Sequence, residues 1–498
     1  MQLGDVLNIH GKIDWRQAIP QTEVKAIAFD SRKVDAGTIY VAIRGTEADG
    51  HRYVADAANQ GAIAIIVEDV SVVPDFFQGA VVNVLDSRLS LQAISQNFYS
   101  NPGDHLYSVA VTGTNGKTSV SYILEHMLNS LRFSCGVIGT IDHHFKSRSW
   151  PSELTTPDPV TLQERLKEFV DFGAKAFVIE ASSHALKQGR LKQGIDIAIF
   201  TNFSRDHLDY HQTLEDYFKS KARLFTKSMM KEGRESLAVI NGDDIHGEQL
   251  AVLTPRTSFL FGEGENCDFR FRLVSENLKA TKFMLTFPNG KAYEVVSPLL
   301  GKHNIYNYVA AIACVYLMNL DYKEAIASMK RFPGIPGRMQ KVGKADHKVA
   351  FVDYAHTDDA LRNVLGLIAR LTPEGKRLIT VFGCGGDRDK GKRSFMGRVA
   401  FELSDTIIVT SDNPRSEDPQ SIIDDILEGL PLPSERVIQE VDRKKAIEMA
   451  VDRAKPGDVI VVAGKGHEDY QIIGGQRHHF SDYEILKSLL TVIDKEES

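Results

Sequence analysis

Short apolar runs separated by polar turns fill the first hundred residues of the chain. The runs are rich in valine and isoleucine, which favour strands, and they lie at residues 26–30, 38–43, 62–68 and 80–85. A helical pattern follows near residues 91–99 and stops at Pro102, since proline cannot continue a helix. The pattern predicts a small α/β domain over residues 1–102.

A second block, residues 103–332, alternates strand-like and helix-like segments. Its apolar strand-like runs lie at residues 106–111, 135–140, 176–180 and 195–203. Apolar side chains recur with the spacing of one helix face at Val120, Ile123, Leu124, Met127, Leu128 and Leu131. Asp158 and Pro159 are typical of a helix start, and another helix is expected near residues 213–227. This alternation predicts a mostly parallel sheet covered by helices on both faces.

A stretch rich in proline and glycine at residues 331–338 predicts a linker into a third α/β domain, residues 333–498. Four apolar strand-like runs follow at residues 348–352, 377–382, 406–410 and 459–463. Each run ends in a polar turn, at residues 353–356, 383–389, 411–415 and 464–468. In an open α/β sheet, ligands bind outside the carboxyl ends of the strands. Four polar turns together therefore favour a binding site there over ordinary connecting loops.

Composition narrows the class of protein. The 498 residues are 43% hydrophobic and 25% charged, the balance of a globular protein of about three domains. The net charge of −7 and the lack of a long basic run argue against a dedicated nucleic-acid or anionic-membrane binder. The cysteines show neither metal-ligand nor disulfide-framework spacing; they are Cys135, Cys267, Cys314 and Cys384. With no signal-peptide pattern and no apolar run long enough to insert into a membrane, we expect a cytoplasmic protein.

The segment Gly113–Thr118, GTNGKT, lies between a predicted strand and a predicted helix. Backbone N–H groups at such a turn can face phosphate oxygens, and the helix N-terminus adds partial positive charge. Lys117 would reach the terminal phosphates, and the Thr118 hydroxyl would hold Mg²⁺. Two residues separate the glycines here, whereas the generic phosphate loop has four. A structural turn with an unrelated lysine therefore stays open as an alternative.

Carboxylate, hydroxyl and imidazole groups follow two other strands of this block. Glu180 ends one strand and leads into a Ser-Ser-His segment, and His207 follows another strand. Together with the phosphate loop they could serve a Mg²⁺ site with one or two centres. Alternatively, His184 caps the start of a helix, and His207 with Asp206 and Asp209 forms a solvated turn.

Ten short motifs spread along the whole chain resemble those of the Mur ligases of peptidoglycan synthesis. They are TGTNGKTS (112–119), TTPDP (155–159), EASSHALKQGR (180–190), TNFSRDHLDYH (201–211), YFKSKARLF (217–225), PGRMQ (336–340), DYAHT (353–357), FGCGGDRDKGKR (382–393), DNPR (412–415) and GKGHE (464–468). The shortened phosphate loop is the form that this family uses. The resemblance is greatest to the members that add the third residue of the peptide.

The resemblance implies an N-terminal UDP-binding domain, a central ATPase domain with a P-loop-type parallel sheet, and a C-terminal Rossmann-like domain for the incoming amino acid. It implies ATP-driven amide formation in cell-wall biogenesis, and hence a link to cell shape, the cell cycle and cell division. The carboxylate of UDP-MurNAc-L-Ala-D-Glu becomes an acyl phosphate, which the amine of meso-diaminopimelate attacks. Because the carboxylate and the γ-phosphate are both anionic, Mg²⁺ and Lys117 must offset their repulsion. We expect small-molecule substrates only, and a monomer.

The resemblance also assigns binding residues. The ATP group is Gly113, Thr114, Asn115, Gly116, Lys117, Thr118, Ser119, Asn304, Arg338 and Asp353. The UDP-dipeptide group is Ser31, Thr155, Thr156, Ser182, Gln188 and Arg190. The Mg²⁺ ligands are Thr118, Glu180, His207 and Lys221, of which the last three are also catalytic, together with Lys117. The chain departs from the family's pattern beside these positions, at Lys302–His303, Gln340 and Asp358.

Lys221 carries the least obvious of these roles. In the family, the lysine of the Y-x-x-x-K-A-x-L-F motif is carbamylated by CO₂, and the resemblance implies the same here. A carbamate is an anion that can ligate a second Mg²⁺, which a plain lysine cannot do. The alternative is a helix-surface lysine beside Lys219 and Arg223, because lysines are mostly exposed.

The turn at residues 412–415 bears on which amino acid the enzyme adds. In the family, an arginine here accompanies meso-diaminopimelate, which has a distal carboxylate that lysine lacks. The resemblance implies contacts from Arg388, Asp412, Asn413, Pro414, Arg415, Gly464 and Glu468. Arg415 can bind the distal carboxylate bidentately, with a hydrogen bond from Asn413, while Glu468 faces the distal ammonium. Leaving a buried arginine unpaired is costly, so lysine should be rejected strongly.

Four alternatives to this interpretation stay open. Arg415 could be a surface arginine after a proline turn. The enzyme could be a lysine-adding homologue or a folylpolyglutamate-type ligase. The chain could also be a nucleotide-binding sensor with little chemistry, which would bind nucleotide without substrate-dependent hydrolysis.

Overall fold

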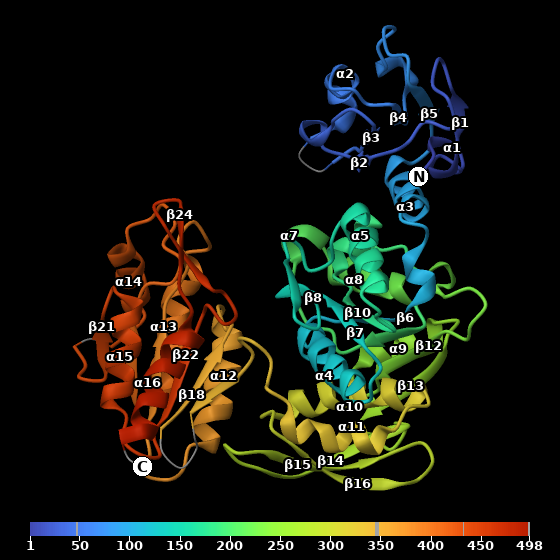
Figure 1. Ribbon diagram of the computed structural model, residues 1–498. Coiled ribbons are helices and arrows are strands. Elements are labelled where there is room, and N and C mark those ends of the chain that lie inside the picture. Colours follow the sequence, from blue (N-terminus) through green and yellow to red (C-terminus); the bar gives the residue numbers. More distant parts are fainter. Residues whose placement is uncertain (46–47, 344–347, 432, 497–498) are drawn as a thin grey trace. The chain divides into compact units, whose positions relative to one another are not determined.

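The computed structural model describes residues 1–45, 48–343, 348–431 and 433–496 (Figure 1). It forms two compact units. Unit 1 joins Met1–Arg270 with Tyr306–Ile326, and unit 2 joins Phe271–Ile305 with Ala327–Ser498. The fold is α/β throughout, as predicted. The domain boundaries after residues 102 and 332 stay a prediction.

The N-terminal part of unit 1 is a five-stranded sheet in the order β1-β5-β4-β3-β2. Strands β2–β5 are parallel, and β1 is antiparallel to β5. Its elements are α1 (Leu3–Val6), β1 (Lys12–Asp14), β2 (Ala26–Ala28), β3 (Thr38–Val41), α2 (Val54–Asn59), β4 (Ala64–Val67), β5 (Ala80–Asn83) and α3 (Ser87–Phe98). Helices α1 and α3 pack on one face and α2 on the other. The four predicted strands and the predicted helix are confirmed.

The larger sheet of unit 1 places its parallel strands in the order β13-β12-β11-β6-β10-β7, and the antiparallel strands β8 and β9 extend the β7 edge. The strands are β6 (Tyr107–Thr112), β7 (Cys135–Ile138), β8 (Asp142–Phe145), β9 (Arg148–Pro151), β10 (Ala176–Glu180), β11 (Ile197–Phe200), β12 (Leu237–Asn241) and β13 (Thr257–Gly262). The helices are α4 (Lys117–Ser130), α5 (Pro159–Asp171), α6 (Ser183–Gln188), α7 (Leu208–His211), α8 (Leu214–Ala222) and α9 (Ile245–Leu253). Helix α4 packs on β6, β7 and β10, and α5 and α8 pack on the opposite face. The predicted parallel sheet with helices on both faces is confirmed.

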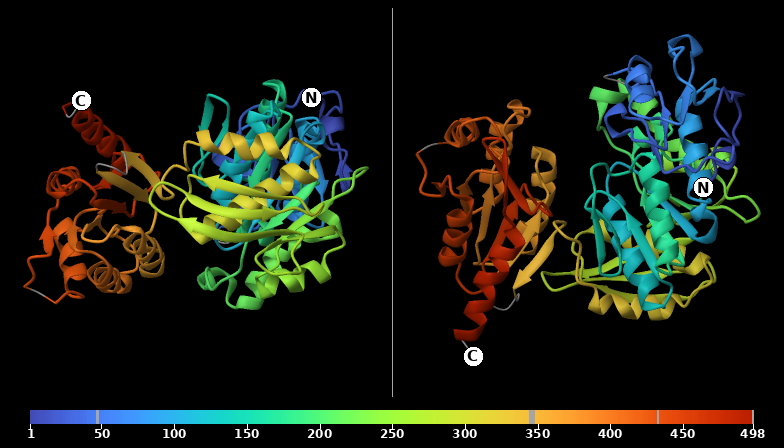
Figure 2. Two further views of the ribbon diagram at one scale, coloured as in Figure 1. Left: turned by 90° about the horizontal axis from the view of Figure 1, so that it is seen from below. Right: turned by 45° about the horizontal axis from the view of Figure 1, so that its top comes forward.

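Unit 2 is built on a six-stranded sheet in the order β17-β18-β22-β19-β20-β21, parallel except for β17. Its elements are β17 (Gln340–Gly343), β18 (Val349–Asp353), α12 (Asp358–Leu371), β19 (Leu378–Phe382), α13 (Gly391–Leu403), β20 (Thr406–Val409), α14 (Pro419–Leu427), β21 (Val437–Gln439), α15 (Arg443–Arg453), β22 (Val459–Ala463) and α16 (Asp482–Glu496). Helices α12–α14 cover one face, and α15 and α16 cover the other (Figure 1 and Figure 2). The four predicted strands are confirmed, and they form the centre of this sheet.

Several strands were not predicted from the sequence. Among the strands given above these are β1, β8, β9, β12, β13, β17 and β21. The others are β14 (Phe269–Glu276), β15 (Thr281–Thr286), β16 (Ala292–Ser297), β23 (Tyr470–Ile473) and β24 (Gln476–His479); the remaining helices are α10 (Lys302–Leu317) and α11 (Tyr322–Ser328). Strands β14–β16 bury only part of their side chains, so they lack the continuous apolar run that marks a strand buried on both faces. Within the described part of the chain, no helix has the length and apolar character needed to cross a membrane.

A half-buried charged cluster joins the β8–β9 edge of unit 1 to α4. His144 on β8 lies between two carboxylates, with Nδ1 2.7 Å from Asp142 Oδ1 and Nε2 3.0 Å from Glu125 Oε2. Tyr122 of α4 donates to Asp142 at 3.1 Å. Burial opposes the charge on His144, but the hydrogen bonds and charges of Asp142 and Glu125 outweigh it and raise the pKa of His144 to about 10.

The raised pKa predicts a pH-dependent contribution of His144 to stability. The contribution is fully present below the unfolded pKa of about 6.5 and is lost as the pH rises through about 10. We expect His144→Gln to lower the free energy of unfolding by about 2–4 kcal/mol at pH 6 and by much less at pH 10. Urea unfolding followed by tryptophan fluorescence measures this, because Trp15 and Trp150 both lie in unit 1.

The control is His479→Gln, which removes an exposed histidine 2.7 Å from Glu484. Exposed ion pairs contribute little to stability, so this variant should unfold like the unmodified protein. An equal loss at pH 6 and pH 10 for His144→Gln would contradict the assignment of a charged imidazole.

Candidate active site

The segment Gly113–Thr118 forms the turn between β6 and α4, as predicted. Gly113 has φ 147 and Gly116 has φ 90, backbone conformations that side-chain-bearing residues rarely adopt. A Cβ on Gly113 would lie 1.9 Å from Thr201 Oγ1, and one on Gly116 would lie 2.3 Å from Asn307 Oδ1. Both glycines are therefore required by the close packing of the turn as well as by its shape.

The end of β11 holds this turn in place. Asn202 accepts from two backbone N–H groups of the turn, at 2.9 Å from Thr114 to its carbonyl and at 2.9 Å from Asn115 to its Oδ1. Thr201 Oγ1 donates to the Asn115 carbonyl at 2.6 Å. These N–H groups are engaged with Asn202, so the predicted phosphate contacts of this turn would come from the N-terminal end of α4, where Ser119 completes the first turn. That role stays a prediction.

Two lysine ammonium groups converge on one carbonyl oxygen of this turn. Lys117 Nζ donates to the carbonyls of Gly113 and Thr114, each at 2.9 Å. Lys221 Nζ, from α8, donates to the Gly113 carbonyl at 2.7 Å. Only 1% of Lys221 is exposed, so its interpretation as a helix-surface lysine is wrong. Burial, together with the nearby Lys117 charge, lowers the pKa of Lys221 well below its usual value.

A buried carboxylate lies beside the start of α4. Glu180, at the end of β10, accepts from Thr118 Oγ1 at 3.0 Å and from the N–H and Oγ1 of Thr140 at 3.0 and 2.9 Å. Carboxylate and hydroxyl oxygens are the donors that Mg²⁺ prefers, with substrate phosphates completing its shell. Glu180 and Thr118 therefore fit a Mg²⁺ ion, although the described residues contain no group of three or more His, Cys, Asp and Glu side chains that could hold a metal on their own.

His207 lies at the start of α7 with φ 52. Its ring lies 5.0 Å from that of His184 and 5.8 Å from that of Tyr217. The side chains of His207 and Asp206 are both about half exposed, as the alternative of a solvated turn requires. The role of His207 as a metal ligand stays a prediction.

The suggestion that His184 caps a helix is wrong. Helix α6 is capped by Ser182, whose Oγ accepts from the N–H of Ala185 at 3.2 Å. The His184 ring stacks on Tyr210, with ring centres 4.2 Å apart. The cap needs an oxygen acceptor one residue before the helix begins, and Ser182 is at that position.

Three residues of the predicted UDP-dipeptide group line one cavity of about 770 Å³ in unit 1: Ser31, Gln188 and Arg190. Tyr40, Arg88 and Asp158 also line it and were missed by the sequence analysis. They lie on β3, on α3 and directly before α5, far apart in the sequence, so no local pattern indicated that they would meet.

The other predicted UDP-dipeptide residues belong to a chain of hydrogen bonds that runs from Arg190 to Glu180 at the end of β10. Arg190 donates to the Thr156 carbonyl, and Thr156 Oγ1 donates to the Glu180 carbonyl at 2.6 Å. Ser182 N–H donates to Thr156 Oγ1 at 3.0 Å, and Thr155 Oγ1 lies 3.1 Å from that of Thr140. Burial lowers the pKa of Arg190.

The other predicted ATP residues belong to unit 2. Asp353, at the end of β18, accepts from the N–H groups of Met339 and Ala355 at 2.7 and 2.9 Å. Burial raises the pKa of Asp353, and the nearby Arg338 charge opposes this. Arg338 lies over the Tyr354 ring, and Asn304 Nδ2 donates to the Leu300 carbonyl at 2.7 Å. A role for these residues at a nucleotide shared with unit 1 stays a prediction.

The polar turns after β20 and β22 meet in unit 2. Asn413 Nδ2 donates to Glu468 Oε2 at 2.8 Å. Lys465 Nζ, fully buried, donates to Asn413 Oδ1 and Glu468 Oε2, each at 3.2 Å. Lys465 was not predicted. The sequence feature that could have indicated it is a lysine between two glycines directly after a strand. A lysine buried at such a position needs carboxylate or amide partners.

Asp412 and Gly464 lie beside this group. Asp412 is buried, and burial raises the pKa of its carboxyl group. Its backbone carbonyl accepts from Gln471 Nε2 at 2.7 Å. Gly464, directly after β22, donates its N–H to the Asp353 carbonyl at 3.1 Å, so the ends of β18 and β22 are held together.

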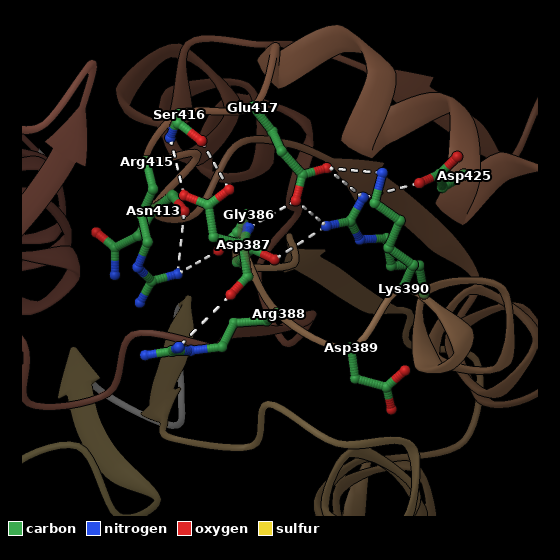
Figure 3. A network of polar contacts seen from close by, with 12 residues as sticks. Gly386, Asp387, Arg388, Asp389, Lys390, Asn413, Arg415, Ser416, Glu417 and Asp425 are labelled. Carbon is green, nitrogen blue, oxygen red and sulfur yellow. Dashed lines mark hydrogen bonds and ion pairs between the residues drawn. The ribbon is translucent and has the colours of Figure 1, made fainter. Parts of the chain in front are cut away.

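Arg415 and Arg388 belong to the neighbouring loops after β20 and β19 (Figure 3). The Arg415 guanidinium donates to the Gly386 carbonyl at 2.7 Å, and its backbone N–H donates to the Ile472 carbonyl at 3.0 Å. Pro414 is buried. The half-buried Arg415 is thus tied into its turn, and its role at a substrate carboxylate stays a prediction.

A nucleotide-type loop in one α/β unit and a cluster of charged side chains at the strand ends of another are the features of an ATP-dependent, amide-forming ligase. Family models match three stretches: "Mur ligase family, catalytic domain" at residues 23–99, "Mur ligase middle domain" at 111–315 and "Mur ligase, glutamate ligase domain" at 337–466. The chain belongs to the Mur ligase family.

Individual relatives agree with this membership. A protein of Geobacter metallireducens is 40% identical over 93% of each chain, and one of Thermosynechococcus vestitus is 41% identical over 94% of this chain and 93% of its own. Both are named UDP-N-acetylmuramoyl-L-alanyl-D-glutamate--2,6-diaminopimelate ligase. A solved structure of that name is 34% identical with a TM-score of 0.72 over 99% of each chain. MurF from Acinetobacter baumannii is 19% identical with a TM-score of 0.65 over 99% of this chain and 98% of its own, and shares the fold.

The packing around Glu180 predicts a sensitive position. A Cβ on Gly139 would lie 2.2 Å from Glu180 Oε1, so Gly139→Ala should push the carboxylate away from Thr118. We expect ATP turnover to fall at least about tenfold, measured as substrate-dependent phosphate release.

The matched control is Gly366→Ala, within α12, where a Cβ meets no atom within 4 Å. Alanine favours a helix by about 1 kcal/mol over glycine, so this variant should keep full activity. Unchanged turnover in Gly139→Ala would contradict a role for the Glu180 position.

Proposed function

We propose that this protein joins meso-diaminopimelate to UDP-MurNAc-L-Ala-D-Glu in an ATP-dependent reaction of peptidoglycan synthesis. The observation that carries the proposal is the charge pattern in unit 2. Arg388 and Arg415 lie on two neighbouring loops, and the loop of Arg415 is hydrogen-bonded through Asn413 to the carboxylate of Glu468. A distal carbon that bears both a carboxylate and an ammonium needs partners of both signs. The names of the relatives support the choice of substrate.

The partners of Glu468 bear on this recognition. Lys465 neutralises part of its charge, and Asn413 holds one of its oxygens at 2.8 Å. A substrate ammonium would add a further donor to a carboxylate that is already oriented. An amino acid without the distal carboxylate would leave Arg415 without a charged partner, which is costly at a desolvated site.

The first chemical step uses the turn before α4. An oxygen of the D-Glu carboxylate forms a bond to the γ-phosphorus of ATP, and the bond from that phosphorus to the bridging oxygen of ADP breaks. Lys117 and the N-terminal end of α4 offset the repulsion between the two anions. Thr118 and Glu180, with His207, would hold Mg²⁺, which supplies further positive charge at the phosphates.

The second step forms the amide. The amine of diaminopimelate attacks the acyl carbon, a tetrahedral intermediate forms, and inorganic phosphate leaves while the nitrogen loses a proton. Arg190 and the other residues that line the 770 Å³ cavity, with Thr156 hydrogen-bonded to Arg190, would hold the UDP-dipeptide. The UDP-linked dipeptide and the free amino acid are both small polar molecules, so we place the enzyme in the cytoplasm. We propose that it acts as a monomer.

Lys221 is proposed to carry a carbamate. Its depressed pKa favours the neutral amine, and the neutral amine is the form that attacks CO₂. The new N–C bond forms as the nitrogen loses a proton, which converts the side chain into an anion. Such an anion would be the ligand of a second Mg²⁺ near the phosphate turn.

Phosphate release in the presence of ATP, the UDP-dipeptide and a panel of amino acids tests the proposal. We expect meso-diaminopimelate to exceed L-lysine by about 100-fold or more in kcat/KM. Better turnover with lysine, or with a folate and glutamate, would reject this substrate. Nucleotide binding without amino-acid-dependent release would point to a sensor.

Lys221→Ala tests the carbamate. Turnover should fall by about 100-fold or more, and short carboxylates such as acetate should restore part of it by occupying the anion's place. Lys219→Ala is the matched control, because Lys219 lies on the same helix, exposed, 2.7 Å from Glu215. Full activity of Lys221→Ala without added carboxylate would end the proposal.

A further inference from the structure

Ion pairs and hydrogen bonds join the two loops that carry Arg388 and Arg415 (Figure 3). One loop runs from β19 to α13 and the other from β20 to α14, and β19 and β20 are neighbouring parallel strands. Each loop contains a non-glycine residue in the left-handed region, Asp387 with φ 53 and Arg415 with φ 54. Such conformations persist where the surrounding contacts hold them.

The carboxylate of Glu417 is the centre of this network. Two nitrogens of Arg393 donate to it, at 2.9 Å to Oε1 and 3.0 Å to Oε2, the fork geometry in which arginine binds a carboxylate strongly. Oε1 also accepts the N–H of Asp387 at 2.6 Å. The hydrogen bonds from Arg393 and Asp387 lower the pKa of Glu417 to about 2, so it stays charged at neutral pH.

Further hydrogen bonds join the loop after β19 to the loop after β20. The Asp387 carboxylate accepts from Ser416 Oγ at 2.7 Å and from Ser416 N–H at 3.1 Å. Gly386 N–H donates to the Asn413 carbonyl at 2.9 Å, and the Gly386 carbonyl accepts from Arg415 at 2.7 Å. The left-handed residue of each loop is thus held by the other loop.

Arg393 also determines where the Glu417 charge is directed. Its side chain is completely buried and pairs with Asp425 at 2.7 Å as well as with Glu417. Because Arg393 engages both oxygens of Glu417, that carboxylate is held toward α13 and does not neutralise Arg415, two residues earlier in the chain. In Figure 3 the guanidinium groups of Arg415 and Arg388 both point away from the Glu417 carboxylate.

We propose that the Arg393–Glu417 pair is a positioning device that fixes the two loops so that Arg388 and Arg415 are directed at the distal carboxylate of the amino-acid substrate. The inference rests on the proposed function, because it takes that carboxylate as the ligand of these loops. Arg393 and Glu417 act through their neighbours and are positioning residues. They should therefore affect the choice of amino acid and leave phosphoryl transfer at the Lys117 turn unchanged.

Glu417→Gln tests the device, because it keeps the size of the side chain and removes the charge that Arg393 holds. We expect the KM for meso-diaminopimelate to rise about tenfold and the preference over L-lysine to fall by a similar factor, with kcat within about twofold and the KM for ATP unchanged. The measurement is phosphate release by the full-length protein with ATP and UDP-MurNAc-L-Ala-D-Glu.

Two further variants make the test specific. Ser416→Ala removes one hydrogen bond to Asp387 and leaves the buried pair intact, so it reports on the loops even where Glu417→Gln does not fold; a rise in the same KM of about threefold is expected. Glu402→Gln is the matched control, because Glu402 lies on α13 in a half-exposed pair with Arg362 at 2.8 Å. Its kinetics should equal those of the unmodified enzyme.

Unchanged KM and unchanged preference in both Glu417→Gln and Ser416→Ala, with an unmodified enzyme that uses meso-diaminopimelate, would overturn the positioning role and leave the proposed function standing. Equal losses of kcat with every amino acid would also overturn it, because they indicate a general structural role. An unmodified enzyme that does not use meso-diaminopimelate would overturn the proposed function itself.

Discussion

Because both faces of a covered parallel sheet are buried, functional polar side chains are placed mainly in the loops at the ends of its strands. In unit 1 the central strands β6, β10 and β11 are mostly apolar and end in Thr112, Glu180 and Phe200. The carboxyl ends of parallel strands lie at one edge of the sheet. The phosphate-type turn, the Glu180 carboxylate and the Asn202 amide are therefore neighbours, although about ninety residues separate the first from the last.

Charge within this edge is arranged around a single backbone carbonyl. Lys117 and Lys221 both donate to the Gly113 oxygen. Burial lowers the pKa of Lys221, and the nearby charge of Lys117 adds to this effect. The proposed chemistry uses both properties, because the positive charge of Lys117 would face a phosphate and a lowered pKa at Lys221 favours its neutral amine.

In unit 2 the polar side chains also lie at the carboxyl ends of parallel strands, and buried charged residues behind them hold them in place. Asn413, Glu468 and Arg415 lie on the loops, and the charges behind them are held by Lys465 and Arg393, which are fully buried. Buried charges are costly unless they are paired and hydrogen-bonded. Lys465 and Arg393 each have at least two partners, so the inner layer is rigid and the outer side chains are directed by it.

Much of the fold could be predicted from the sequence because apolar periodicity reports local structure. The strands at residues 176–180 and 459–463 and the helix that begins at Lys117 appear where the pattern placed them. Strands that bury few side chains, such as β14, were missed because most of their positions are exposed. The motifs gave most of the candidate site residues, and the resemblance gave their roles, since a motif records chemistry but not contacts.

By itself the sequence determined the α/β class, the glycine turn before α4 and the set of polar turns at the strand ends, since these depend on neighbours in the chain. Tertiary structure alone decided that Lys221 is buried against Gly113 and that Arg393 holds Glu417. Burial, pKa and ion pairing depend on which distant segments pack together, and a linear pattern carries no distance between residues that are far apart in the chain.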